Sequence, residues 1–115
     1  MTNAYFWQED VKGGIEFCAQ FEGHAWFDIG RPDVVCAGCS VLSQALLRAL
    51  MDEGFKVRHR YEKEIPLLEF RVVADDVLDA ERIEYMFKVC RAGFEMLKEN
   101  YPENVFVSGE KPRKH

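Results

Sequence analysis

The first 22 residues have the pattern of two strands joined by a turn, and apolar and polar positions alternate in the second half of this segment. The apolar members of the second half of this segment are Ile15, Phe17, Ala19 and Phe21, and the intervening ones are Glu16, Cys18, Gln20 and Glu22. A period of two is typical of a β-strand with one packed face. The paired glycines in Lys12-Gly13-Gly14 accept the positive φ angles of a tight turn. The pattern predicts a β-hairpin over residues 1–22.

The period changes to three and four residues after Pro32. The predicted helix runs from Val34 to Glu53, with Asp33 as its N-cap and Gly54 at its C-terminal end. Its expected buried stripe is Val35, Cys39, Leu42, Leu46 and Leu50, and its expected exposed side carries Ser43, Gln44, Arg48 and Asp52.

Two further strands and a second helix follow. Alternation predicts strands over residues 55–62 and 68–72. A helix is expected from Asp76 or Asp79 to just before Pro102, and Val105-Phe106-Val107 is a candidate final strand. The apolar stripe of this helix is Ile83, Phe87, Cys90, Phe94, Leu97 and Tyr101, which we interpret as a core face.

The element order is therefore ββαββα with a possible C-terminal strand. It predicts an α+β, two-layer sandwich with two helices on one face of a mostly antiparallel sheet. We expect a single domain over residues 1–109 and a disordered polar tail over residues 110–115.

The length and the net charge of the chain exclude some classes of function. At 115 residues the chain has room for one domain, and its net charge of -5 argues against nucleic-acid binding. The N-terminus lacks the basic and apolar regions of a signal peptide, and no segment is expected to reach the length of a membrane helix. A cytoplasmic protein is predicted, in which the four cysteines are packing residues, metal ligands or nucleophiles.

Cys36 stands apart from the other cysteines because it follows the predicted cap Asp33 by three residues. Backbone N–H groups and the helix dipole favour a thiolate there. His24 lies twelve residues earlier, across a loop that could fold back. A cysteine at a helix start with a histidine in reach permits nucleophilic catalysis, although this pattern alone is weakly specific.

The residues around this pair resemble a known family. Gly23-His24-Ala25, Asp33-Val34-Val35-Cys36-Ala37 and Ser40 are similar to the signature of Prp, the bacterial ribosomal-processing cysteine protease family. Trp26 stands where a glycine usually follows His-Ala. The resemblance implies a homodimeric, cofactor-free cysteine endopeptidase whose substrate is a ribosomal protein precursor. It implies removal of the N-terminal extension of large-subunit ribosomal protein twenty-seven during ribosome assembly.

Carried over by position, the resemblance makes Cys36 the nucleophile and His24 the general base. Gly23, Trp26, Asp33, Ala37 and Ser40 are the expected supporting or substrate-binding residues. Asp33 is also explained by capping alone, and Ser40 by a hydrogen bond within its own helix.

Three alternatives remain open at this stage. Cys36-Ala37-Gly38-Cys39 has the Cys-x-x-Cys spacing of thiol oxidoreductases. A zinc site from His24, Cys36, Cys39 and His59 is chemically possible, although no second ligand pair supports it and we expect no metal. A non-enzymatic or divergent ribosome-associated interaction module could use the basic residues Lys56, Arg58 and Arg60 for an acidic partner.

Overall fold

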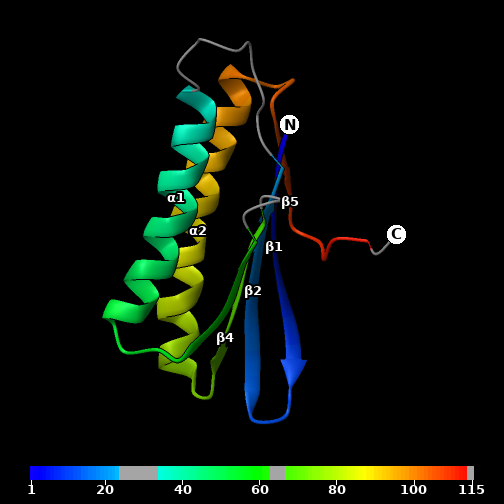
Figure 1. Cartoon of the computed structure of the whole chain (residues 1–115). Helices are drawn as coiled ribbons and strands as arrows, with labels where there is room; N and C mark the ends of the chain where they lie inside the picture. Colours follow the sequence, from blue (N-terminus) through cyan, green and yellow to red (C-terminus); the bar gives the residue numbers. More distant parts are fainter. Residues whose placement is uncertain (24–33, 63–66, 114–115) are drawn as a thin grey trace.

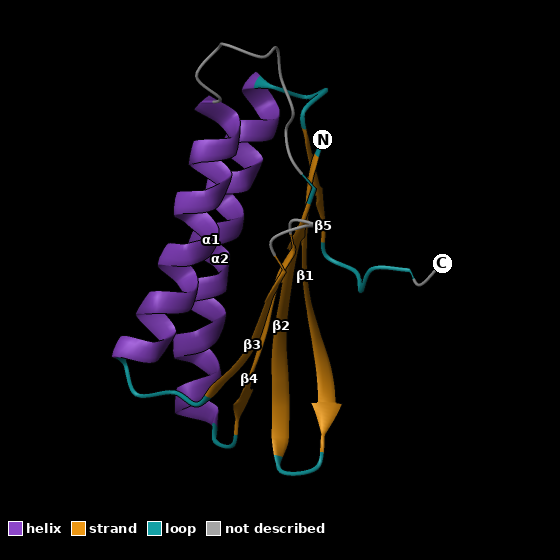
Figure 2. Ribbon diagram, viewed as in Figure 1, coloured by secondary structure: helices purple, strands orange, loops and turns teal. Residues whose placement is uncertain are grey.

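A five-stranded sheet carries two helices side by side on one of its faces, and in the described part of the chain no helix lies on the other face (Figure 1). The computed structural model describes residues 1–23, 34–62 and 67–113. The elements are β1 (Thr2–Val11), β2 (Gly14–Glu22), α1 (Val34–Asp52), β3 (Val57–Glu62), β4 (Leu67–Ala74), α2 (Val77–Asn100) and β5 (Val105–Ser108). The predicted α+β class and element order are confirmed, including the terminal strand (Figure 2).

The sheet has the strand order β3-β4-β2-β1-β5. All neighbouring pairs are antiparallel except β1 and β5, which run parallel from Thr2 opposite Val105. The β1–β2 hairpin turns at Lys12-Gly13, where Gly13 has φ 97°, a left-handed conformation that glycine adopts without a steric penalty. The predicted turn is therefore confirmed.

The helices cover the apolar face of the strands. Phe17, Ala19 and Phe21 of β2 all belong to the buried core, as the alternation predicted. Phe94 of α2 is fully buried, and its ring stacks on Phe21 with centroids 5.1 Å apart. Aromatic rings of both layers thus join the helices to the sheet.

The predicted α1 stripe is confirmed at Val35, Cys39, Leu46 and Leu50, which are all buried, but it differs at two neighbouring positions. Ser43, expected on the exposed side, is only 5% exposed, whereas Leu42 is partly buried. The hydroxyl of Ser43 donates to the carbonyl oxygen of Ser40 at 3.1 Å. This hydrogen bond within the helix satisfies the buried hydroxyl, which is why a serine can occupy a buried position.

Cys18 and Glu16 also differ from a simple inside-outside alternation. Both lie on the helix-free face of β2, yet Cys18 is fully buried and Glu16 is 4% exposed. Arg71 of β4 covers them, and its Nη1 lies 3.1 Å from Glu16 Oε1 and 3.8 Å from Cys18 Sγ. Cys18 is therefore a packing residue, but its neighbours are charged.

The expectation that no segment reaches the length of a membrane helix was wrong for α1. This helix has 19 residues, and an 18-residue window within it has a mean hydropathy of 1.7. By length and composition alone, such a helix could span a membrane. The core helix of a soluble protein passes the same test, and α1 packs Val35, Cys39, Leu46 and Leu50 into the core. The apolar composition of α1 is therefore weak evidence for a membrane span.

Candidate active site

Cys36 lies in the first turn of α1, at the end of the molecule that also holds the N-terminus and the end of α2 (Figure 1). It opens into a pocket of about 140 Å³. The pocket is lined by residues of the hairpin, α1, β3 and β4: Thr2, Phe21, Glu22, Gly23, Cys36, Cys39, Ser40, Ser43, Gln44, Tyr61, Leu67 and Leu68. The fold thus gathers segments that are far apart in the sequence around one thiol.

The start of α1 is an electrostatically favourable place for a thiolate. The first backbone N–H groups of a helix lack helical acceptors, and the dipole is positive there. The first turn of α1, as the structure describes it, contains no acidic residue to oppose a negative sulfur. Cys36 is partly exposed, so its sulfur can meet a substrate from the pocket.

The other cysteines lie in settings that keep them protonated or buried. Burial raises the pKa of the Cys18 thiol and that of the Cys90 thiol to about 12. Cys90 donates to the carbonyl oxygen of Leu42 at 3.4 Å. Cys39 is 6% exposed within the hydrophobic core. Of the four cysteines, Cys36 is the one best placed to react.

The Cys-x-x-Cys alternative loses support from this placement. Both cysteines line the pocket, but Cys36 is partly exposed, whereas Cys39, one turn later, is only 6% exposed and belongs to the hydrophobic core. Packing against the core is sufficient to account for a cysteine at position 39. The spacing of Cys36 and Cys39 is therefore better explained by helix packing than by redox chemistry.

Ser40 is exposed on α1 and lines the same pocket as Cys36. Its Oγ accepts a hydrogen bond from Gln44 Nε2 at 2.8 Å, one turn further along. Gln44 was expected on the exposed side but not as a pocket residue. Together the two side chains offer polar hydrogen-bonding groups to whatever enters the pocket. Ala37 is exposed in the first turn.

Gly23 ends the described part of the hairpin beside Cys36. Its φ of 82° is left-handed, and a Cβ there would overlap the carbonyl oxygen of Met1. Only glycine therefore fits at this point of close approach. His24 is the next residue in the sequence, and His24, Trp26 and Asp33 lie outside the described residues.

Glu22 is a pocket residue that the sequence interpretation missed, since it was expected simply to face solvent. Its carboxylate accepts hydrogen bonds from Gln20 at 3.0 Å, Tyr5 at 3.4 Å and Asn3 at 3.5 Å. These bonds hold a negative charge at one wall of the pocket. Burial raises the pKa of Tyr5, and the nearby Glu22 carboxylate raises it further. The feature of the sequence that could have indicated this role is the position of Glu22, two residues before His24.

Tyr61, Leu67 and Leu68 form another wall that spacing alone did not reveal. They come from β3 and β4, and Leu67 pairs with Glu22 across the sheet. Tyr61 is 65% exposed. An exposed aromatic ring and two leucine side chains thus add apolar groups to a pocket that α1 lines with the polar Ser40 and Gln44.

The zinc alternative gains no support from the described residues. Within residues 1–23, 34–62 and 67–113, the side chains close enough to share a metal are Glu9 with Glu16 and Cys18, and three acidic residues near the start of α2. Neither group contains Cys36, Cys39 or His59. In the first group the Arg71 guanidinium already supplies the positive charge.

Comparisons with known structures show the same fold. The chain is similar to the ribosomal processing protease Prp of Staphylococcus aureus, crystallised with a covalently linked product peptide (TM-score 0.78, 18% identity, 96% of this chain and 100% of that one). A second structure of that protease, with a substrate peptide, matches at a TM-score of 0.76 and 17% identity over the same shares. SMU.848 of Streptococcus mutans matches at 0.67 and 26% identity over 96% of each chain. No curated protein sequence matches significantly.

The sequence itself supplies the stronger comparison. The family model described as cysteine protease Prp matches residues 1–106, which includes the hairpin, both helices and the segment from Gly23 to Ser40. This match spans every element that builds the Cys36 pocket. The chain belongs to the Prp family of cysteine proteases.

Proposed function

We propose that this protein is a cysteine endopeptidase that removes the N-terminal extension of large-subunit ribosomal protein twenty-seven during ribosome assembly. The observation that carries the proposal is the position of Cys36, which is partly exposed at the start of α1 and opens into the same pocket as Gly23. Membership of the Prp family supports the reaction type. The peptide complexes of the Staphylococcus aureus protease support a peptide substrate.

The proposed reaction is acyl transfer through a Cys36–His24 dyad. His24 takes the proton of the Cys36 thiol, and the thiolate attacks the scissile carbonyl carbon. The backbone N–H groups of Cys36 and Ala37 bind the resulting oxyanion, as the unpaired donors of a helix start can. His24 then returns the proton to the leaving amine, and water hydrolyses the thioester to free Cys36.

The supporting residues have separate proposed roles. Gly23 lets the chain pass close to Met1 at the edge of the pocket, and it immediately precedes His24 in the sequence. Asp33 caps α1, and Ser40 binds the substrate backbone through its pocket-lining hydroxyl. Trp26 contributes an apolar wall for the peptide.

The pocket walls suit an extended peptide with an apolar side chain. Tyr61, Leu67, Leu68 and Phe21 would contact that side chain, whereas Ser40 and Gln44 would meet backbone groups. Such a division, apolar surface plus a few placed polar groups, is typical of ligand sites. Cleavage specificity would then depend on β3 and β4 as well as on α1.

We further propose that the enzyme acts in the cytoplasm as a homodimer. The outer side of the helix layer exposes Val41, Tyr85 and Val89, each at least 65% exposed. An apolar groove of about 310 Å³ lies between α1 and α2 at Leu42, Ala45, Met86 and Val89, among others. Contiguous exposed apolar surface of this kind supports self-association. Light scattering after size-exclusion chromatography gives the molar mass of the parent and of the Val89→Glu variant, and so tests the homodimer. A monomeric parent would contradict the proposal.

Cleavage of a peptide spanning the extension, followed by mass spectrometry, tests the activity. The parent should yield one defined product pair, and Cys36→Ala should yield none. Cys39→Ala is the matched control and should still cleave, because Cys39, although it borders the pocket, is only 6% exposed and is not the proposed nucleophile. Circular dichroism confirms that each variant is folded. Absence of product with the folded parent, or undiminished cleavage by Cys36→Ala, would refute the proposal.

A further inference from the structure

A second and larger hollow lies on the helix-free face of the sheet, with a volume of about 640 Å³. Five cationic side chains line it, together with the Glu69 carboxylate: Arg58, Arg60, Arg71, Lys111 and Arg113. None of its lining residues belongs to the pocket of Cys36. This concentration of positive groups is unexpected in a chain of net charge -5.

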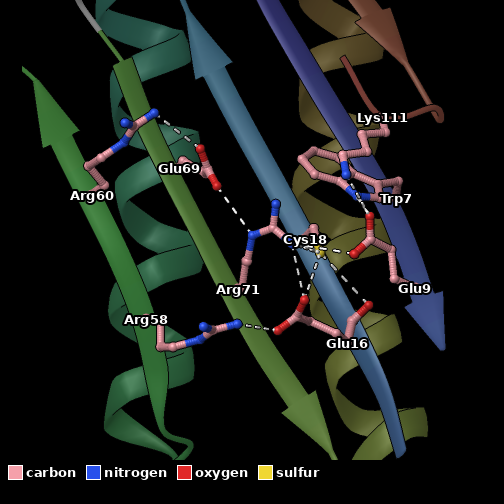
Figure 3. A network of polar contacts seen from close by, with 9 residues as sticks. All are labelled: Trp7, Glu9, Glu16, Cys18, Arg58, Arg60, Glu69, Arg71 and Lys111. Carbon is pink, nitrogen blue, oxygen red and sulfur yellow. Dashed lines mark hydrogen bonds and ion pairs between the residues drawn. The ribbon is translucent and has the colours of Figure 1, made fainter. Parts of the chain in front are cut away.

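The strand register brings two of these arginines face to face. Arg58 of β3 is the direct cross-strand partner of Arg71 of β4, and like charges at such positions repel. The carboxylate of Glu16 lies between them: its Oε2 accepts from Arg58 Nη2 at 2.6 Å and its Oε1 from Arg71 Nη1 at 3.1 Å (Figure 3). The side chain of Glu16 is 5% exposed. Glu16 is therefore a buried carboxylate that the two arginines share.

The neighbouring carboxylates bind only some of the N–H donors of Arg58 and Arg71. Arg71 uses Nε toward Glu69 at 3.2 Å and Nη1 toward Glu16 and Glu9, but among the described residues its Nη2 makes no such bond (Figure 3). Arg58 uses Nη2 alone within the same part of the chain. A guanidinium has five N–H donors, so both arginines retain donors for a further anion.

The C-terminal segment forms another wall of the hollow. Lys111 Nζ lies 3.2 Å from Glu9 Oε1, and this contact attaches the segment to β1 beside Trp7 (Figure 3). Arg113 lines the hollow from the same segment, whereas Arg60 lines it from β3. Cations therefore reach the hollow from two strands and from the segment after β5.

We propose that this hollow binds a compact polyphosphate anion, such as the phosphate chain of a nucleotide. Guanidinium groups match phosphate oxygens in pairs, and several converging cations favour a ligand that carries several charges. A ligand with a single carboxylate would bridge fewer of them than a triphosphate does. The hollow also falls within the range of about 300–1,000 Å³ that small-molecule sites occupy. The inference is independent of the proposed peptidase activity.

Isothermal titration calorimetry of the full chain with inorganic tripolyphosphate tests this site. We expect saturable binding of one anion per chain that weakens with added salt. The variant Arg60→Gln/Arg113→Gln should bind about tenfold or more weakly, since it loses two charge-assisted contacts. Arg48→Gln/Lys88→Gln makes the same change in net charge on exposed positions of the helices and should bind as the parent does.

Circular dichroism separates loss of the site from loss of the fold. Arg60 is exposed, and its two ion pairs are long, so its substitution should change stability little. The proposal would be overturned if the folded parent showed no saturable binding of tripolyphosphate. It would also be overturned if both double variants bound the anion equally more weakly than the parent, because the anion would then be attracted by net charge alone. Equal or tighter binding of a hexaglutamate peptide would also overturn it, because the site would then be one for acidic peptides.

Discussion

The α-carbon of Gly23 lies against the carbonyl oxygen of Met1, so close that a methyl group on Gly23 would overlap that oxygen. The contact joins the end of β2 to the beginning of β1 at the edge of the Cys36 pocket. Gly23 also has a left-handed φ of 82°. The chain thus leaves β2 at a point where a side chain would be blocked by Met1 and would be strained by the backbone conformation.

Gly23→Ala should destabilise the protein more than Gly13→Ala does. Both positions have positive φ, which costs alanine about 1–2 kcal/mol. A methyl group on Gly13 would meet no atom within 4 Å, whereas one on Gly23 would overlap Met1, which costs about 1–3 kcal/mol more. Urea unfolding of both variants measures the difference. Equal losses would show that the Met1 contact relaxes freely.

Phe94→Ala should reduce the free energy of unfolding by about 3–5 kcal/mol. Phe94 is fully buried and its ring lies 5.1 Å from Phe21 and 5.9 Å from Phe6, so its removal leaves a cavity between α2 and the sheet. Tyr85→Ala is the matched control on the same helix. Tyr85 is 72% exposed, and its substitution should change stability by less than about 0.5 kcal/mol. Similar losses in both variants would contradict this account of the core.

Cys36 should be the first cysteine alkylated by iodoacetamide at neutral pH. It is partly exposed at a helix start, whereas Cys18 and Cys90 are buried and their thiol pKa values are raised to about 12. Because the thiolate is the reactive form, these two should react only after unfolding. Peptide mapping after short labelling, with and without guanidinium chloride, gives the order. Early modification of Cys90 in the folded protein would count against it.

The free energy of unfolding should fall as the pH rises above about 8.5, because an unfolded cysteine loses its proton near that pH. Burial raises the pKa of Cys90 to about 12 in the folded chain. Above pH ~8.5 the unfolded state therefore binds fewer protons than the folded state does. The stability that the neutral Cys90 thiol provides is lost progressively as the pH rises, until it passes the pKa of Cys90 in the folded chain. Cys90→Ala should show a shallower decline between about pH 8 and 10 in chemical unfolding. An unchanged slope would exclude this contribution.

Lys111→Ala should raise the pKa of Glu9 toward its ordinary value. Hydrogen bonding to Lys111, and then to Trp7, lowers the Glu9 pKa in the folded chain. A lowered carboxyl pKa stabilises the fold above the unfolded value, and that contribution is lost as the pH falls through the folded value. NMR titration of the Glu9 side chain measures the shift. Lys88→Ala, on α2, is the control that should leave Glu9 unchanged.

The sequence by itself determined the element order and the family of this protein. Apolar patterns with a period of two, or of three and four, depend only on which residues can be buried together, so they predicted the hairpin, both helices and the helix layer. The motif from Gly23 to Ser40 predicted the family, because it carries the reactive residue types at their spacing. Local patterns were sufficient for both.

Only the tertiary structure decided which distant residues share a surface. The wall of Tyr61 and Leu67 beside Cys36 depends on β3 and β4 joining β2, a pairing that spacing along the chain does not encode. The burial of Glu16 likewise depends on Arg58 and Arg71, which lie 42 and 55 residues away. A charge can be buried only when such partners arrive, and strand register, rather than local propensity, brings them together.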